Sequence, residues 1–210
     1  MKAVIFDCDG VLVDSEPLSE AAWTEGLARF GYRVADGDFG FCLGRNRRDI
    51  HAFFVTKHPL PGFDEFSAVI DEVIRPRLEA ELRAFPDAVD TVQELALNGI
   101  PLAVASSSQR SDLDVKLDRA GLRRYFDVTI AGDEVAAGKP APDLYLGAAA
   151  ALGLAPSVCL AVEDSPAGAD AADAAGMRVV TVGRDGRLVG GRPSVDRLDA
   201  GLIMTWLGLR

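Results

Sequence analysis

The sequence contains little cysteine, and its cysteines are far apart. Three of the 210 residues are cysteines, Cys8, Cys42 and Cys159. No two of them have the close spacing of a zinc or redox motif. Cys8 and Cys159 fall in apolar runs, where cysteine usually behaves as a small buried side chain. An odd number of reduced thiols is typical of a cytoplasmic protein, so we expect that location.

Long apolar runs are also missing. Between Lys2 and the first acidic residue there are only four apolar residues, at 3–6, which is too short for a signal peptide. No apolar stretch approaches the length needed to span a bilayer. Internal repeats are absent, and the alanine run at 148–151 is the one low-complexity tract. We therefore expect a globular protein with no membrane partner.

The sequence has fewer basic than acidic residues. The chain has 22 lysines and arginines against 32 acidic residues, which gives a formal net charge of -10. This balance argues against nucleic acid or an anionic membrane as the main partner. A phosphorylated metabolite is not excluded, because a bound cation can reverse the field inside a cleft. With 49% hydrophobic and 26% charged residues, the composition is that of a globular protein with an adequate core.

Alternating strand and helix patterns predict an α/β fold with a mostly parallel sheet. Buried strands are expected at 3–6, 100–105, 128–131, 157–162 and 178–182. The helices between and around these strands are expected at 88–98, 111–120, 143–152 and 166–175. This order of elements is typical of a Rossmann-like core of three layers.

One long block interrupts the alternation directly after the first strand. Its apolar residues are spaced by three and four, which predicts helices at 16–30, 50–55 and 63–82. Pro76 should kink the last helix or mark its boundary. We therefore predict a discontinuous core, residues 1–14 and 83–210, with an all-helical cap domain inserted at 15–82. The hinge candidates are residues 14–15 and 82–86.

The most informative motif lies at the end of the first strand and contains two carboxylates. Asp7 and Asp9 are one residue apart and are followed by Gly10, which lets the chain turn without steric penalty. The carboxyl ends of parallel strands are where ligands bind in open α/β sheets. Buried acids need compensation, and Mg²⁺ suits carboxylate oxygens. These two acids can therefore act as a nucleophile, Asp7, and a general acid and base, Asp9.

Polar residues also follow later strands or the loops between them. Ser106 and Ser107 follow the second strand and could bind phosphate at a helix N-terminus. Lys139, between glycine and proline, would supply a fixed cation. Glu163 and Asp164 follow the fourth strand and could complete a magnesium site. Each motif alone also fits a turn, a helix cap or a solvated loop. Their occurrence in this order favours one site.

With these motifs the chain resembles the haloacid dehalogenase superfamily of hydrolases, in the branch containing β-phosphoglucomutase and sugar-phosphate phosphatases. The matching segments are FDCDGVLVDSE, the SSS after the second strand, GKPAPDLY and VEDSPAGADAADAAGM. The resemblance covers nearly the whole chain and implies a Rossmann-like core with a helical cap. It also implies that Asp7 is the nucleophile, Asp9 the general acid and base, and Ser106 and Lys139 ligands of phosphate. The implied ligands of Mg²⁺ are Asp7, the Asp9 carbonyl and Asp164, with Glu163 assisting the metal.

Three reactions are compatible with this resemblance. Dehalogenases of the superfamily typically lack the second aspartate, so Asp9 argues against that activity. The cap histidine and lysine of the β-phosphoglucomutase pattern correspond to Ser19 and Leu43, which makes a mutase less favoured. We therefore expect a Mg²⁺-dependent phosphatase that acts on a small phosphorylated metabolite. Arg45 and Arg47 are candidate specificity residues of the cap, with Arg47 at the position that clamps a distal phosphate.

A binding module without catalysis is a further alternative, although every catalytic group of the family pattern is present. As partners we expect a small phosphorylated metabolite, and neither nucleic acid nor membrane. The oligomeric state expected is a monomer or a weak homodimer.

Overall fold

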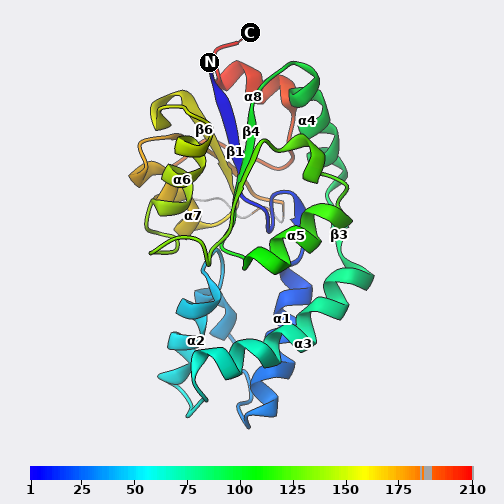
Figure 1. Cartoon of the computed structure of the whole chain (residues 1–210), viewed down its shortest axis with the longest axis vertical. Coiled ribbons are helices and arrows are strands. Elements are labelled where there is room, and N and C mark those ends of the chain that lie inside the picture. Colours follow the sequence, from blue (N-terminus) through cyan, green and yellow to red (C-terminus); the bar gives the residue numbers. More distant parts are fainter. Residues whose placement is uncertain (185, 187–190, 210) are drawn as a thin grey trace.

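The computed structural model describes residues 1–184, 186 and 191–209. Within these residues, a six-stranded parallel sheet has the order β5-β4-β1-β6-β7-β8. The strands, in the order of the sheet, are β5 (Val128–Ile130), β4 (Leu102–Ala105), β1 (Ala3–Phe6), β6 (Cys159–Glu163), β7 (Arg178–Val182) and β8 (Ser194–Val195). Figure 1 shows β1 between β4 and β6, in the middle of the core. The predicted parallel α/β fold is confirmed.

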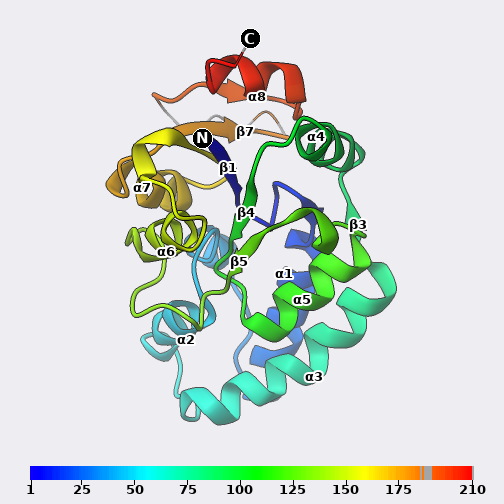
Figure 2. The same ribbon diagram turned by 45° about the horizontal axis from the view of Figure 1, so that its top comes forward.

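Helices cover both faces of the sheet and make it the middle of three layers (Figures 1 and 2). One face is covered by α4 (Pro86–Leu97), α5 (Arg110–Arg119) and α8 (Ala200–Trp206), and the other by α6 (Asp143–Ala151) and α7 (Pro166–Ala174). In β1, Val4 and Phe6 belong to the first of these cores, whereas Ala3 and Ile5 belong to the second. This alternation is the normal geometry of a strand buried on both sides.

Three helices stand away from the sheet (Figure 1): α1 (Glu16–Arg29), α2 (Arg47–Val55) and α3 (Phe63–Glu81). Trp23 of α1 packs against Phe66 of α3, with 5.5 Å between the ring centroids. α3 continues through Pro76, so this proline is not a helix boundary. We propose that these helices, within residues 15–82, form a cap domain.

A short antiparallel ribbon lies where the chain leaves the core and returns to it. In this ribbon β2 (Val13–Asp14) pairs with β3 (Arg83–Ala84). Strands of two residues have no readable periodicity, which is why the sequence did not predict them. Three short 3₁₀ helices, Asp38–Phe41, Arg123–Tyr125 and Pro156–Val158, complete the described elements, and the last of them takes the place of the predicted start of the fourth strand. No described helix is both long and apolar enough to cross a membrane.

Candidate active site

The turn after β1 brings distant acidic residues together. Asp7 is buried, and its N–H donates to the carbonyl of Val162 in β6 at 2.9 Å. Gly10 has a φ of 71°, and a Cβ at this position would lie 1.9 Å from Oδ2 of Asp164. A residue with a side chain would therefore push Asp164 away from the turn. Gly10 thus allows the two strand ends to approach one another.

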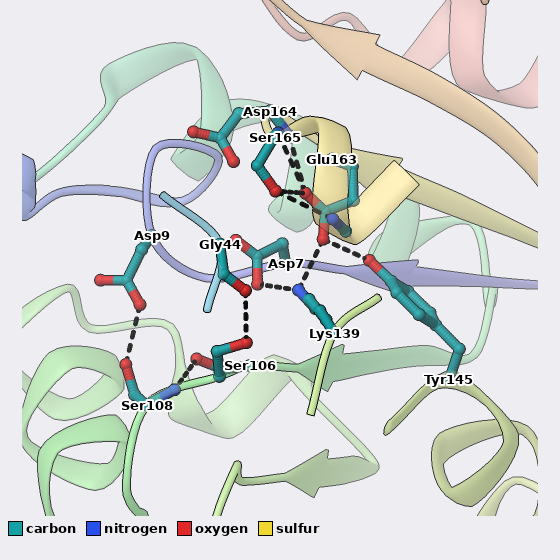
Figure 3. Close-up of polar contacts among 12 residues, drawn as sticks. Asp7, Asp9, Gly44, Ser106, Ser108, Lys139, Tyr145, Glu163, Asp164 and Ser165 are labelled. Atoms are coloured by element: carbon teal, nitrogen blue, oxygen red, sulfur yellow. Dashed lines mark hydrogen bonds and ion pairs between the residues drawn. The ribbon is translucent and has the colours of Figure 1, made fainter. Parts of the chain in front are cut away.

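Lys139 is fully buried between two carboxylates (Figure 3). Its Nζ lies 2.6 Å from Oδ1 of Asp7 and 2.5 Å from Oε1 of Glu163. The hydroxyl of Tyr145 donates to the same Glu163 oxygen at 2.8 Å. Burial lowers the pKa of Lys139, but the Asp7 and Glu163 carboxylates outweigh burial and hold this pKa above its usual range. The site therefore keeps a fixed ammonium group beside Asp7.

Asp7, Glu163 and Asp164 form an acidic group that fits a divalent cation. Each offers a carboxylate oxygen, and these atoms lie within 4.8 Å of one another. Burial raises the pKa of Asp7 to about 7, with Glu163 and Asp9 adding to the rise and Lys139 opposing it. Burial, with the charges of Glu163 and Asp7, raises the pKa of Asp164 well above its ordinary value. One ammonium group does not neutralise this cluster, whereas a hard cation such as Mg²⁺ would.

Protein donors already surround the carboxylate of Glu163. Its Oε2 accepts hydrogen bonds from the N–H of Asp164 at 3.0 Å and from the hydroxyl of Ser165 at 3.1 Å. Its other oxygen is the one that accepts from Lys139 and Tyr145. Asp7 and Asp164 are therefore the side chains that best fit direct metal binding, and Glu163 orients the groups around them.

Asp9 makes a second, separate network (Figure 3). Its Oδ2 accepts a hydrogen bond from the hydroxyl of Ser108 at 2.8 Å, and its Oδ1 lies 2.5 Å from Nζ of Lys116. Ser15 also donates to Oδ1. Burial raises the pKa of Asp9, but Lys116 and the hydrogen bonds outweigh burial and hold this pKa below its usual range. Asp9 thus takes its polar contacts from Ser15, Ser108 and Lys116 rather than from Lys139.

Lys116 lies outside the motifs, and Ser108 lies within the SSS motif but had no predicted role. Lys116 is only 4% exposed and lies on the buried face of α5 with Leu113 and Leu117. A lysine three residues after one core leucine and next to another, on the helix side that faces the sheet, is the signal that could have identified it. Ser108 belongs to the three serines after β4, but the motif emphasised the first two.

The predicted phosphate ligands after β4 lie where the cap loop, the segment before α2 that contains Gly44, meets the core. Ser106 is fully buried, and its hydroxyl accepts a hydrogen bond from the N–H of Ser108 at 3.1 Å. The hydroxyl of Ser107 donates to the carbonyl of Gly44, in the loop before α2, at 2.7 Å. Gly44 has a φ of 72°, and a Cβ there would lie 2.3 Å from Oγ of Ser165. The cap loop therefore packs closely against the ends of two core strands.

A cavity of about 580 Å³ extends from the acidic cluster into the cap. Ser19, Leu43, Arg45 and Arg47 all contribute to its wall. The guanidinium of Arg45 lies 4.2 Å above the ring of Phe41. Arg47 is engaged by carboxylates on both of its terminal nitrogens, so its placement does not favour the predicted role as a phosphate ligand.

Comparisons with known proteins agree with this architecture. Residues 1–176 match the family model described as haloacid dehalogenase-like hydrolase. SUPPRESSOR OF QUENCHING 1 from Arabidopsis thaliana is 36% identical over 87% of this chain, which spans 18% of that longer protein. Hexitol phosphatase A from Escherichia coli is 34% identical over 86% of this chain and 82% of that protein.

A solved structure supports the same assignment. CbbY from Rhodobacter sphaeroides, determined as a variant in complex with Xylulose-(1,5)bisphosphate, is 27% identical with a TM-score of 0.84. The alignment covers 94% of each chain. The family model, the curated relatives and this fold show that the chain belongs to the haloacid dehalogenase-like hydrolases.

Proposed function

We propose that the protein is a Mg²⁺-dependent phosphatase that hydrolyses a small phosphate monoester, such as a sugar phosphate, through an aspartyl-phosphate. The observation that carries this proposal is the convergence of Asp7, Lys139 and Asp164 at the end of the sheet. The similarity to hexitol phosphatase A supports a phosphorylated polyol or sugar as the substrate class.

In the first step, Oδ of Asp7 forms a bond to phosphorus while the bond from phosphorus to the leaving oxygen breaks. Asp9 donates a proton to that oxygen, which leaves as the alcohol. In the second step, Asp9 accepts a proton from water as the water oxygen attacks phosphorus. As the new bond forms, the bond between phosphorus and Oδ of Asp7 breaks, which releases inorganic phosphate and restores the Asp7 carboxylate. Contacts with Lys116, Ser15 and Ser108 hold the pKa of Asp9 below its usual range. Movement of Asp9 away from them would therefore be needed before it can carry the proton that the first step requires.

Other residues would bind the phosphoryl group and the metal. Lys139 stabilises negative charge on the phosphoryl oxygens, with Ser106 and Ser107 as the proposed further ligands. Asp7, the carbonyl of Asp9 and Asp164 would hold Mg²⁺, and Glu163 would support them. The bound ion supplies charge neutralisation between carboxylates and phosphate.

A mutase is the second candidate. Ser19 and Leu43, which line the cavity, stand at the positions of the histidine and lysine of the mutase pattern. We therefore favour hydrolysis. That the protein acts in the cytoplasm, as a monomer or weak homodimer, remains a prediction from the sequence.

Removal of the metal tests the proposal directly. We expect EDTA to lower kcat for phosphate monoesters on the order of 100-fold or more, and added Mg²⁺ to restore it. Mg²⁺ should also raise the midpoint of thermal unfolding, because it binds the folded state. Asp164→Asn should weaken this rise, whereas the exposed Asp170, changed to Asn as a control, should not. Full activity in EDTA would contradict the role of the metal.

A further inference from the structure

The cap side of the cavity contains an arginine whose charge is already neutralised. Nη1 of Arg47 lies 2.5 Å from Oδ1 of Asp71 and donates to Oγ of Ser67 at 2.8 Å. Its Nη2 lies 2.6 Å from Oδ2 of Asp112. Arg47 and Asp112 are both buried, so water screens this pair little. One cation thus faces two carboxylates before any substrate binds.

Asp112 links the core to the cap and forms part of the cavity wall. It lies on α5 of the core, whereas its partner Arg47 lies on α2. Among the described residues, Oδ1 of Asp112 has no hydrogen-bond partner although it is buried. Nη2 of Arg75 is 3.8 Å away, beyond hydrogen-bond distance. Burial raises the pKa of Asp112, and Arg47 is the strongest influence that opposes this rise.

The other charged side chains of the cavity also disfavour a second anion. Its wall has six carboxylates and three cations: Asp7, Asp9, Glu16, Glu20, Asp112 and Asp164 against Arg45, Arg47 and Lys116. Lys116 is paired with Asp9, as Arg47 is with Asp112. Asp7 and Asp164 belong to the phosphoryl and metal end, and so does Glu16, whose charge adds to the raised pKa of Asp164. The wall of the cap end then has Glu20 and Asp112 against Arg45 and Arg47, and Asp71 is a further carboxylate that contacts Arg47. An anionic group at the cap end would therefore meet no excess of positive charge.

Apolar side chains complete this end of the cavity. Trp23 of α1, Ile50 of α2 and Ile70 and Ile74 of α3 contribute to the wall. Such surfaces pack well against the carbon-bound hydrogens of a ring or chain, while carboxylates accept hydrogen bonds from its hydroxyl groups. Together they suit an uncharged, hydroxylated leaving group.

We propose that Asp112 makes the cavity selective for monoesters whose leaving group is uncharged and hydroxylated, and makes it reject a second phosphate. This inference rests on the proposed function and narrows its substrate class. It assigns Asp112 as a specificity-determining residue. It also distinguishes this chain from its relative CbbY, which has been solved with a bisphosphate.

A matched pair of competitors tests the proposal. Fructose 1-phosphate and fructose 1,6-bisphosphate differ by one distal phosphate, and each would compete with hydrolysis of p-nitrophenyl phosphate in the presence of Mg²⁺. For the unaltered protein we expect the monophosphate to bind at least ~10-fold more tightly than the bisphosphate. Asp112→Asn should shift this ratio toward the bisphosphate by ~10-fold, because it leaves Arg47 with a single carboxylate partner.

Two further variants separate the role of Asp112 from folding. Asp71→Asn removes the more exposed partner of Arg47, so the ratio should change by less than about threefold. Adding Arg47→Met to Asp112→Asn should remove the gain in bisphosphate affinity, because no guanidinium is then left to face the second phosphate.

Equal binding of both competitors, or tighter binding of the bisphosphate, by the unaltered protein would overturn the proposal without any variant. An unchanged ratio in folded Asp112→Asn, or a gain in bisphosphate affinity that persists when Arg47→Met is added to it, would also overturn it. Failure of the unaltered protein to hydrolyse p-nitrophenyl phosphate or any other phosphate monoester would instead refute the proposed function, and this inference with it.

Discussion

Asp7→Asn is expected to lower phosphatase turnover by ~10⁴-fold or more, because an uncharged amide oxygen is a poor nucleophile toward phosphorus. The change replaces one oxygen by nitrogen and keeps an acceptor for Lys139, whose Nζ lies 2.6 Å from the present carboxylate. Steady-state assays with Mg²⁺ would measure the loss. Asp170→Asn, a change of the same kind at a side chain that is 59% exposed, should leave turnover unaltered.

The stability of Asp7→Asn provides an independent check. Burial raises the pKa of Asp7 to about 7 in the folded protein, above the usual value for an unfolded chain. A raised carboxyl pKa costs stability increasingly as the pH rises from about 4 through 7. At pH 8 without Mg²⁺, the variant should therefore unfold at a temperature no lower than the unaltered protein. Substantial turnover in a clean preparation of the folded variant would contradict covalent catalysis by Asp7.

Lys139→Met is expected to remove both activity and much of the stability. Lys139 has no exposed surface and contacts Asp7 and Glu163 at 2.6 and 2.5 Å. Loss of its charge leaves two buried carboxylates without their cation, which should cost about 3–5 kcal/mol of unfolding free energy at pH 8. The cost should shrink as the pH falls through about 7, because protonation of Asp7 relieves the repulsion. Chemical denaturation at several pH values would measure it.

A second substitution separates the two effects of Lys139. Adding Glu163→Gln to Lys139→Met removes one uncompensated carboxylate and should restore part of the lost stability. Activity should stay absent, since no cation would face the phosphoryl oxygens. A Lys139→Met variant that is as stable and as active as the unaltered protein would refute the proposed role of this residue.

Much of the core could be predicted from the sequence because its signals are local. The first strand is buried on both faces, so it appears as the short apolar run 3–6, and its bounds are those of β1. The later strands alternate with helices that end at glycine, which is why the parallel sheet and its layers were predictable. Prediction was least complete beyond residue 182, where β8 and α8 are short.

The convergence of the main site residues could be predicted for a similar reason. Asp7 and Asp164 follow strands, Glu163 ends β6, and Lys139 lies in the loop after β5. Parallel strand ends meet at one edge of a sheet. The contacts of Lys139 with Asp7 and Glu163 span 132 and 24 residues, yet topology alone brings them together.

The ion pairs that Arg47 and Lys116 make could not be predicted in this way. Arg47 is read locally as a free cation, but its partner Asp112 is 65 residues away, on a core helix. Lys116 likewise meets Asp9 across 107 residues. The first pair depends on how the cap packs on the core, and the second on how α5 packs beside the turn after β1. Helix periodicity specifies neither packing.

The central claim is that Asp7 carries the phosphoryl group during turnover. The most direct measurement is to quench the enzyme during turnover of a phosphate monoester, reduce it with borohydride, and identify the altered residue by mass spectrometry of peptides. Borohydride reduces an acyl phosphate to an alcohol, so we predict homoserine at position 7 only when substrate and Mg²⁺ are present. Active enzyme with an unmodified Asp7 and the phosphoryl group on another residue would contradict the account.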